Sequence, residues 1–272
     1  MADHRRKIKH LVRIVGTWWG RVLFPPVCTG CRHIVSQPGV LCAPCWAQLR
    51  HIEQPWCAVL GTPFEFDMGA AAISPGALAD PPPFDRARSA VAYSGMARRL
   101  VQSLKYGDRT DLAPWMARWM LRAGAELLPD ADLILAVPLH RRRFLFRRFN
   151  QSAELARALA WLTQKPFEAA AVQRVRSTRQ QVGLGLAERQ RNVQGAFRVA
   201  EAGRSRIKGR KVLVIDDVYT TGATVSALAR ALKRAGAARV DVLTFARVLP
   251  GDFRPDDGAT IYGSTRDIPW LM

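Results

Sequence analysis

The residues best suited to bind a ligand lie in the stretch VLVIDDVYTTGAT, which runs from Val212 to Thr224. An apolar run is followed by two acids, Asp216 and Asp217, and then by a glycine among threonines. Carboxylates at the carboxyl end of a parallel strand can hydrogen-bond the vicinal hydroxyls of a sugar. Gly222 lets the backbone approach a ligand, and the free N–H groups of the following helix, with threonine hydroxyls, suit a phosphate monoester. The stretch therefore predicts a ribose 5-phosphate site.

The simpler alternative is that these residues only cap the next helix, because Thr and Asp favour such positions. A cap needs one such residue, whereas this stretch places two acids and three threonines around a glycine. The ligand site is therefore the favoured interpretation. The sequence contains no Gly-x4-Gly-Lys-Ser/Thr motif, which disfavours a P-loop nucleotide site.

A second polar segment follows the apolar run ADLILAVPLH, which spans residues 131–140. A dense basic run, 141–148, comes next, and Asn150 and Gln151 follow it. Guanidinium groups suit a pyrophosphate group, which has several oxygens to hold. A solvated basic face is the alternative, but the run begins where a predicted strand ends and where ligands bind in parallel sheets. A third basic, glycine-interrupted segment, 174–193, is either a loop that closes over an anion or an ordinary surface connection.

Four of the five cysteines form two Cys-x2-Cys pairs with ten residues between them. Each pair can place two sulfurs on one metal ion, so we predict a structural zinc site, with free thiols as the alternative. Its expected ligands are Cys28, Cys31, Cys42 and Cys45. Cys57 is followed three residues later by Leu60 instead of another cysteine. We therefore expect Cys57 to be a lone buried thiol and expect no second metal site.

Apolar strands that alternate with helices predict a parallel sheet covered on both faces, an α/β fold. The strands are expected at 133–138, 211–218 and 240–248, and the helices at 96–107, 111–127, 151–163 and 224–236. No internal repeat is visible. We predict four parts: an amphipathic helix at 1–24, a zinc-binding module at 25–83, the sheet domain at 84–250 and a C-terminal tail at 251–272.

Composition narrows the class of protein further. The chain has 272 residues, 49% of them hydrophobic, which excludes collagenous and wholly disordered proteins. A net charge of +19 favours polyanionic partners: phosphorylated small molecules, nucleic acid or anionic membrane. Arg13 and Arg21 interrupt the N-terminal apolar stretch, so we expect neither a signal peptide nor a transmembrane span. Few cysteines, arranged as metal ligands, predict a cytoplasmic protein.

The acid and threonine loop resembles the phosphoribosyl pyrophosphate signature of type I phosphoribosyltransferases. Together with RRFNQSAELARAL and RxT…Q…GL…RxxNVxGAF, it resembles the ComF family over roughly residues 20–250. The resemblance implies a type I phosphoribosyltransferase fold behind a four-cysteine zinc module, with Mg²⁺ accompanying phosphoribosyl pyrophosphate. It implies a ribose 5-phosphate loop of Asp216, Asp217, Thr220, Thr221, Gly222, Ala223 and Thr224. It also implies a pyrophosphate loop of Pro138, Leu139, His140 and Arg141.

Two functions remain as alternatives. The first is binding of phosphoribosyl pyrophosphate, with or without transfer of the phosphoribosyl group to an acceptor, for which the sequence offers no obvious nucleophile or base. The second, implied by the family's link to DNA uptake and transformation, is a non-catalytic competence factor that binds single-stranded DNA beside a helicase. The net charge of +19 suits DNA. Tryptophans that could stack on bases, unless they are buried, are Trp18, Trp19, Trp46 and Trp56.

Overall fold

The computed structural model describes residues 25–37, 39–140, 149–176 and 195–249. The predicted N-terminal helix, the C-terminal tail and the basic run 141–148 lie outside these ranges. The chain divides into two compact units, Met1–Gln48 and Leu49–Met272. Among the helices of the described ranges, none has the length and apolar composition needed to cross a bilayer.

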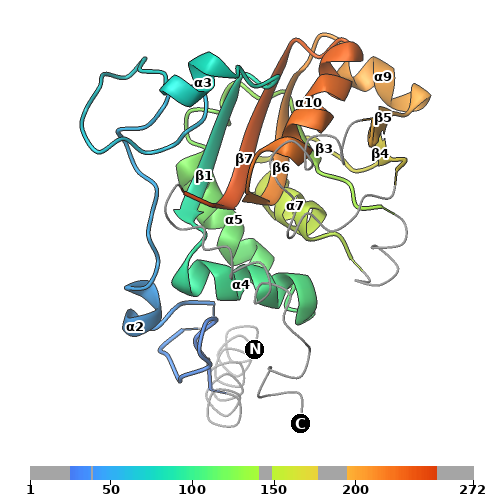
Figure 1. Cartoon of the computed structure of the whole chain (residues 1–272). Helices are drawn as coiled ribbons and strands as arrows, with labels where there is room; N and C mark the ends of the chain where they lie inside the picture. The colour runs from blue at the N-terminus through green and yellow to red at the C-terminus, as the bar shows by residue number, and fades with distance from the viewer. Residues whose placement is uncertain (1–24, 38, 141–148, 177–194, 250–272) are drawn as a thin grey trace, which may run out of the picture. The chain divides into compact units, whose positions relative to one another are not determined.

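A five-stranded parallel sheet forms the centre of the larger unit (Figure 1). Its pairings are all parallel, in the order β1-β7-β6-β2-β3. The strands are β1 (Arg86–Ala92), β2 (Leu133–Ala136), β3 (Phe167–Glu168), β6 (Lys211–Tyr219) and β7 (Arg239–Arg247). A separate antiparallel pair consists of β4 (Val172–Arg174) and β5 (Phe197–Val199). The predicted parallel α/β sheet is confirmed.

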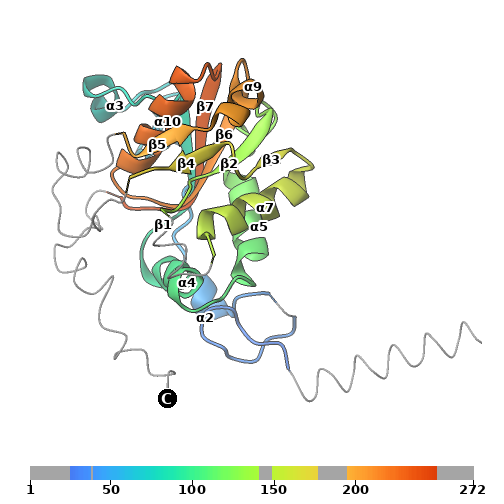
Figure 2. The same cartoon turned by 90° about the vertical axis from the view of Figure 1, so that its right-hand side faces the viewer.

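Helices cover both faces of this sheet, as Figures 1 and 2 show. On one side lie α5 (Leu112–Ala123) and α7 (Gln151–Thr163), with α4 (Gly95–Tyr106) near them, and on the other lies α10 (Ala223–Arg234). A short helix, α9 (Glu201–Ile207), precedes β6. Because both faces are covered, the central strands are apolar along most of their length, which explains why they carry no alternating pattern.

Some element boundaries differ from the prediction for local reasons. The sequence did not predict β1, which runs from Arg86 to Ala92 and pairs with β7 along its length. The helix expected to reach residue 127 ends at Ala123. Gly124 follows it, and a Cβ there would lie 2.7 Å from the side chain of Leu243, so glycine allows the end of the helix to pack closely against β7.

Candidate functional site

The carboxyl ends of β2 and β6 bring two predicted segments to the same edge of the sheet. Ala136 pairs with Ile215, and the N–H of Val137 donates to the Ile215 carbonyl at 2.9 Å. Pro138, Leu139 and His140 therefore leave the sheet beside the strand that carries Asp216 and Asp217. Each of these three residues is partly buried. Arg141 lies outside the described residues.

Two side chains from neighbouring helices hold the acid pair. The Ser152 hydroxyl, in the first turn of α7, donates to Asp216 Oδ1 at 2.7 Å. Lys105 Nζ, in the last turn of α4, lies 3.0 Å from Asp217 Oδ2. Asp217 is 7% exposed, and its N–H donates to Asp216 Oδ1 at 3.0 Å. The acids are thus fixed by partners from three elements, and sequence reasoning identified neither Lys105 nor Ser152.

The environment of Asp216 favours its protonated form. Removal from water, together with the negative charge of Asp217, raises the pKa of Asp216 to about 7. The Ser152 hydrogen bond and the positive charge of Lys105 oppose this rise only in part. Asp216 therefore titrates near neutral pH, and an added cation would favour its ionised form.

Asn150 connects the helix that carries Ser152 to the end of β2. Its side chain caps α7 by accepting the Ser152 N–H at 3.1 Å, and it donates to the Val137 carbonyl at 3.0 Å. Gln151 is 1% exposed, and its amide lies 3.5 Å from the Lys105 carbonyl. Both residues, expected near an anion from sequence, thus position the helices around the acid pair.

The loop after β6 has a backbone that requires glycine. Gly222 has φ of 75°, and a Cβ at this position would lie 2.3 Å from the Tyr219 hydroxyl. Gly222 is also the N-cap of α10, so the capping residue has no side chain with which to cap the helix. The Thr221 hydroxyl is buried and has no hydrogen-bond partner among the described residues. These features favour a ligand-binding loop over a simple helix cap.

Arg247, at the end of β7, supports the base of this loop. Its guanidinium lies 4.0 Å from the centroid of the Tyr219 ring, and the residue is 3% exposed. Burial lowers the pKa of Arg247, although the Tyr219 phenol opposes this effect. No local pattern in the sequence connects this arginine with the loop.

The four predicted cysteine ligands form one cluster. Their sulfur atoms all lie within 4.8 Å of one another. In a tetrahedral site with Zn–S bonds of about 2.3 Å, sulfurs lie about 3.8 Å apart. Cys28 and Cys31 flank a turn, while Cys42 precedes, and Cys45 lies within, the short helix α2 (Ala43–Trp46). The arrangement fits one ion with four protein ligands, as in structural zinc sites.

Hydrogen bonds prepare part of this cluster for ionisation. Burial acts to raise the pKa of the Cys28 thiol, but backbone N–H groups, including that of Cys42 at 3.2 Å, lower it to about 6. Burial and the neighbouring sulfurs raise the pKa of Cys45. Four adjacent thiolates repel one another, so full ionisation needs a cation, which zinc would supply.

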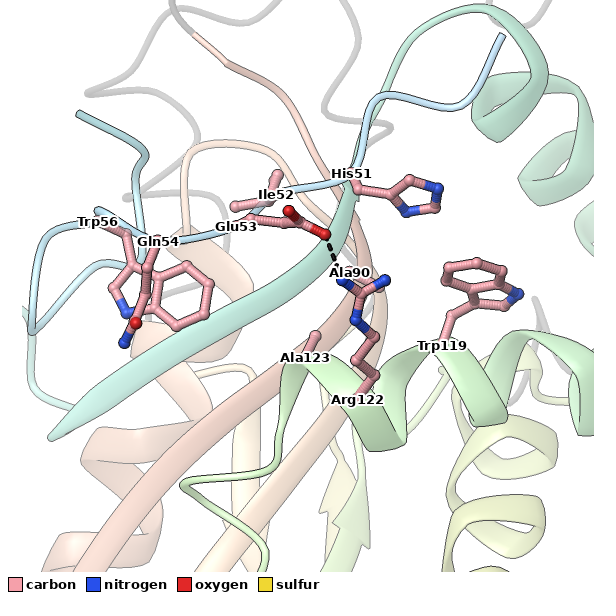
Figure 3. A pocket seen from close by; sticks show the side chains of 9 residues that line it. All are labelled: His51, Ile52, Glu53, Gln54, Trp56, Ala90, Trp119, Arg122 and Ala123. Carbon is pink, nitrogen blue, oxygen red and sulfur yellow. Dashed lines mark hydrogen bonds and ion pairs between the residues drawn. The ribbon is translucent and has the colours of Figure 1, made fainter. Parts of the chain in front are cut away.

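A separate cavity of about 330 Å³ lies between β1, α5 and the segment before β1 (Figure 3). The His51 and Trp119 rings stack at its rim, 4.6 Å apart, and Arg122 pairs with Glu53 across it. Burial and the charge of Arg122 lower the pKa of His51. Trp56, expected as a possible base-stacking residue, lines the opposite side. Trp46 is 45% exposed, whereas Trp18 and Trp19 lie outside the described residues.

Comparisons with known proteins agree with this architecture. Residues 19–74 match the double zinc ribbon domain, and residues 152–270 match the phosphoribosyl transferase domain. The chain therefore joins a zinc ribbon region to a phosphoribosyltransferase-type domain. One solved structure with similarity is an allosteric regulatory enzyme of purine biosynthesis, with 21% identity and a TM-score of 0.36, covering 53% of this chain and 30% of that one.

Relatives matched over most of their own length identify the family. DNA utilization protein YhgH of Salmonella typhimurium is 33% identical over 82% of this chain and 91% of its own length. The Escherichia coli K12 protein of the same name is 35% identical over 63% of this chain and 76% of its own. Competence protein F of Haemophilus influenzae is 27% identical over 81% of this chain and 95% of its own length. The chain belongs to this family, the ComF family.

Proposed function

We propose that the larger unit binds 5-phosphoribosyl 1-pyrophosphate, or a related ribose phosphate, at the carboxyl edge of β2 and β6. The observation that carries the proposal is the acid pair, held by Ser152 and Lys105 and followed by the Gly222 loop. In this assignment the acids bind the ribose hydroxyls, and Thr220 to Thr224 bind the 5-phosphate through hydroxyls and N–H groups. The segment from Pro138 to Arg141 binds the pyrophosphate.

Mg²⁺ fits this assignment because it keeps several waters and is commonly held by one or two carboxylates together with substrate phosphates. Asp216 and Asp217 are the oxygen donors next to the loop. When bound, Mg²⁺ would neutralise charge on the pyrophosphate. The role of the chain's own residues is to orient the ribose and to keep the phosphates next to the N–H groups of α10.

Calorimetric titration with phosphoribosyl pyrophosphate and Mg²⁺ tests the proposal. Wild-type protein should bind, and the double variant Asp216→Asn, Asp217→Asn should lose binding while its thermal unfolding stays cooperative. Glu201→Gln is a matched control, since Glu201 lies in α9 and its ion pair in the described structure is with Arg204 of the same helix. Equal binding by wild type and the double variant would refute the acid assignment.

Transfer of the phosphoribosyl group to an acceptor is the enzymatic form of this proposal. It would release pyrophosphate, so pyrophosphate formation with ammonia, amines or nucleobases as acceptors tests it directly. The double variant provides the background rate. If the folded protein binds the ligand but releases pyrophosphate with none of these acceptors, its function would be to bind the ligand without transferring the phosphoribosyl group to them.

A second candidate function is binding of single-stranded DNA in the cytoplasm. The names of the relatives, DNA utilization protein and competence protein, favour it, as does the net charge of +19. The cavity lined by His51, Trp56 and Trp119 offers aromatic rings on which a base could stack. Binding through phosphate contacts would weaken steeply as salt increases.

Fluorescence anisotropy with a labelled oligonucleotide, measured over a range of salt, tests the DNA proposal. Charge reversal across Arg141–Arg148 should weaken binding and flatten its salt dependence. Trp56→Ala should weaken binding without changing the salt slope, because stacking releases no counterions. An unchanged slope in the charge-reversal variant would exclude that basic run as the DNA site.

A further inference from the structure

Residues 55–79 repeat the backbone hydrogen bonding of residues 26–46. We call the earlier segment ribbon 1 and the later one ribbon 2. In each, the N–H of a cysteine, Cys28 or Cys57, donates to the carbonyl five residues later, at 2.6 and 2.8 Å. The N–H four residues later donates back to that cysteine's carbonyl, at 2.9 and 2.8 Å. The residues in this fourth place, Arg32 and Gly61, have φ of 64° and 66°.

The flanking residues continue the correspondence. The residue before each cysteine forms an antiparallel bridge with the residue six positions after the cysteine: Val27 with Ile34, and Trp56 with Pro63. The residue after each cysteine donates its N–H to the second arm of its ribbon, at 3.1 Å in ribbon 1 and 2.8 Å in ribbon 2. The two ribbons therefore share one fold and one register.

The second arms also match. The N–H groups of Cys42 and Ser74 donate to the sulfurs of Cys28 and Cys57, both at 3.2 Å. Cys42 and Ser74 are the N-caps of short helices, α2 and α3 (Pro75–Ala79), with closely similar backbone angles. In each helix the one buried residue is the third, Cys45 in α2 and Ala77 in α3.

This correspondence locates the ligand positions of ribbon 2. Cys28, Cys31, Cys42 and Cys45 of ribbon 1 match, in order, Cys57, Leu60, Ser74 and Ala77. Leucine and alanine offer no ligand atom, and a serine hydroxyl is not among the usual protein ligands of zinc. The match to a double zinc ribbon implies two metal sites, but the residues of ribbon 2 do not fit a metal.

Protein contacts take the place of a metal in ribbon 2. Cys57 is fully buried, and its sulfur accepts N–H groups from Leu60 at 3.3 Å and from Ser74. Arg88, from β1, donates to the Ala58 carbonyl at 3.1 Å.

A second buried arginine holds the same turn. Arg247, from β7, donates to the Leu60 carbonyl and lies 3.3 Å from the Thr62 hydroxyl. Gly61 packs closely on β1, since a Cβ there would lie 2.3 Å from the Ala87 carbonyl oxygen. The turn is thus fixed to the sheet by two buried guanidinium groups.

We propose that ribbon 2 is a metal-free copy of ribbon 1, in which hydrogen bonds to Arg88 and Arg247 replace the metal. The protein then binds a single zinc ion, at ribbon 1. All five cysteines of the chain lie in the described ranges, so no further thiolate is available to complete a second site.

Metal analysis of purified full-length protein tests this proposal. Wild type should contain one zinc per chain, and Cys57→Ala should contain the same amount. The triple variant Leu60→Cys, Ser74→Cys, Ala77→Cys should contain two, because it restores a four-thiolate set on an existing backbone. Adding Cys57→Ala to the triple variant should return the count to one. Cobalt substitution should double the tetrathiolate absorbance only in the triple variant.

Three results would overturn the proposal: two zinc ions in wild type, loss of zinc in Cys57→Ala, or a folded triple variant that still holds one. The first two need only wild type and a single conservative substitution. They decide the metal-free claim even if the triple variant does not fold.

Discussion

Lys105 Nζ and Asp217 Oδ2 lie 3.0 Å apart, so the last turn of α4 supplies a positive charge to the acid pair at the end of β6. The lysine side chain is 17% exposed and the aspartate side chain 9%. The acid pair would otherwise repel the phosphates of an anionic ligand. At the proposed ligand site, the ion pair would reduce this repulsion.

Lys105→Met should weaken binding of phosphoribosyl pyrophosphate by roughly 10- to 150-fold, the effect of losing about 1.5–3 kcal/mol from a hydrogen bond to a charged group. Lys105→Arg should retain part of the affinity. Lys165→Met is the control, since Lys165 Nζ donates to the Ala131 carbonyl at 2.7 Å, before the start of β2. Calorimetry provides the measurement, and an unchanged affinity in Lys105→Met would contradict this role.

The raised pKa of Asp216 predicts a pH-dependent stability. Between its ordinary value of 3.8 and about 7, the folded protein binds more protons at this group than the unfolded chain does. The contribution of Asp216 to the free energy of unfolding therefore falls as pH rises through this window. Asp216→Asn, which can still accept the Ser152 hydrogen bond, should gain stability relative to wild type between about pH 5 and pH 8. Urea unfolding of both proteins at pH 5 and at pH 8 measures their free energies of unfolding. If the difference between the two proteins were the same at both pH values, the prediction would be wrong.

Gly222→Ala should destabilise the protein and abolish ligand binding. A residue with a Cβ at φ of 75° costs about 1–2 kcal/mol, and the contact with the Tyr219 hydroxyl should add about 1–3 kcal/mol. Gly195→Ala is the matched control, because Gly195 has φ of 67° and, its chain neighbours aside, no atom of the described residues lies within 4 Å of its ideal Cβ. Denaturant unfolding of the two variants separates the cost of backbone strain from the cost of the contact with Tyr219. Equal losses in the free energy of unfolding would show that the Tyr219 ring moves away freely.

Removal of zinc should affect the two units differently. Chelation should unfold the described part of the smaller unit, residues 25–37 and 39–48, because the four-cysteine cluster holds it together. Amides of β6 and β7 should stay protected, since the apolar core around them contains none of the four cysteine ligands. Hydrogen exchange with mass spectrometry, before and after chelation, measures both regions. Loss of protection in the sheet would show that its fold depends on the metal.

The sequence predicted the three inner strands of the sheet, β2, β6 and β7, and its main helices, because long apolar runs and helical spacing are local signals. It also placed the acids and threonines in one loop, because these residues are adjacent in the chain, and the role of this loop as a ligand site stays a prediction. Ser152 and Lys105 could not be found in this way. Their contacts with Asp216 and Asp217 join residues that are distant in the sequence. No local sequence pattern distinguishes Lys105 from the rest of the chain's 41 lysines and arginines.

The relation between the two ribbons was invisible for a different reason. No internal repeat is apparent in the sequence, because ribbon 2 differs from ribbon 1 at three of four ligand positions and has a longer second arm. What the ribbons share is backbone hydrogen bonding, which many sequences can form. Only the structure could show that Leu60, Ser74 and Ala77 occupy positions equivalent to those of cysteines.

The metal-free ribbon also affects how the protein folds when little zinc is present. Ribbon 2 lies with the sheet in the unit Leu49–Met272, whereas the four-cysteine cluster lies in Met1–Gln48. A chain made during zinc starvation would lack an ordered ribbon 1 but would still fold the sheet and its acid pair. Metal supply would then decide whether ribbon 1 is ordered, while the fold of the larger unit would not depend on it. If ribbon 2 had four thiolates, the larger unit would also need zinc.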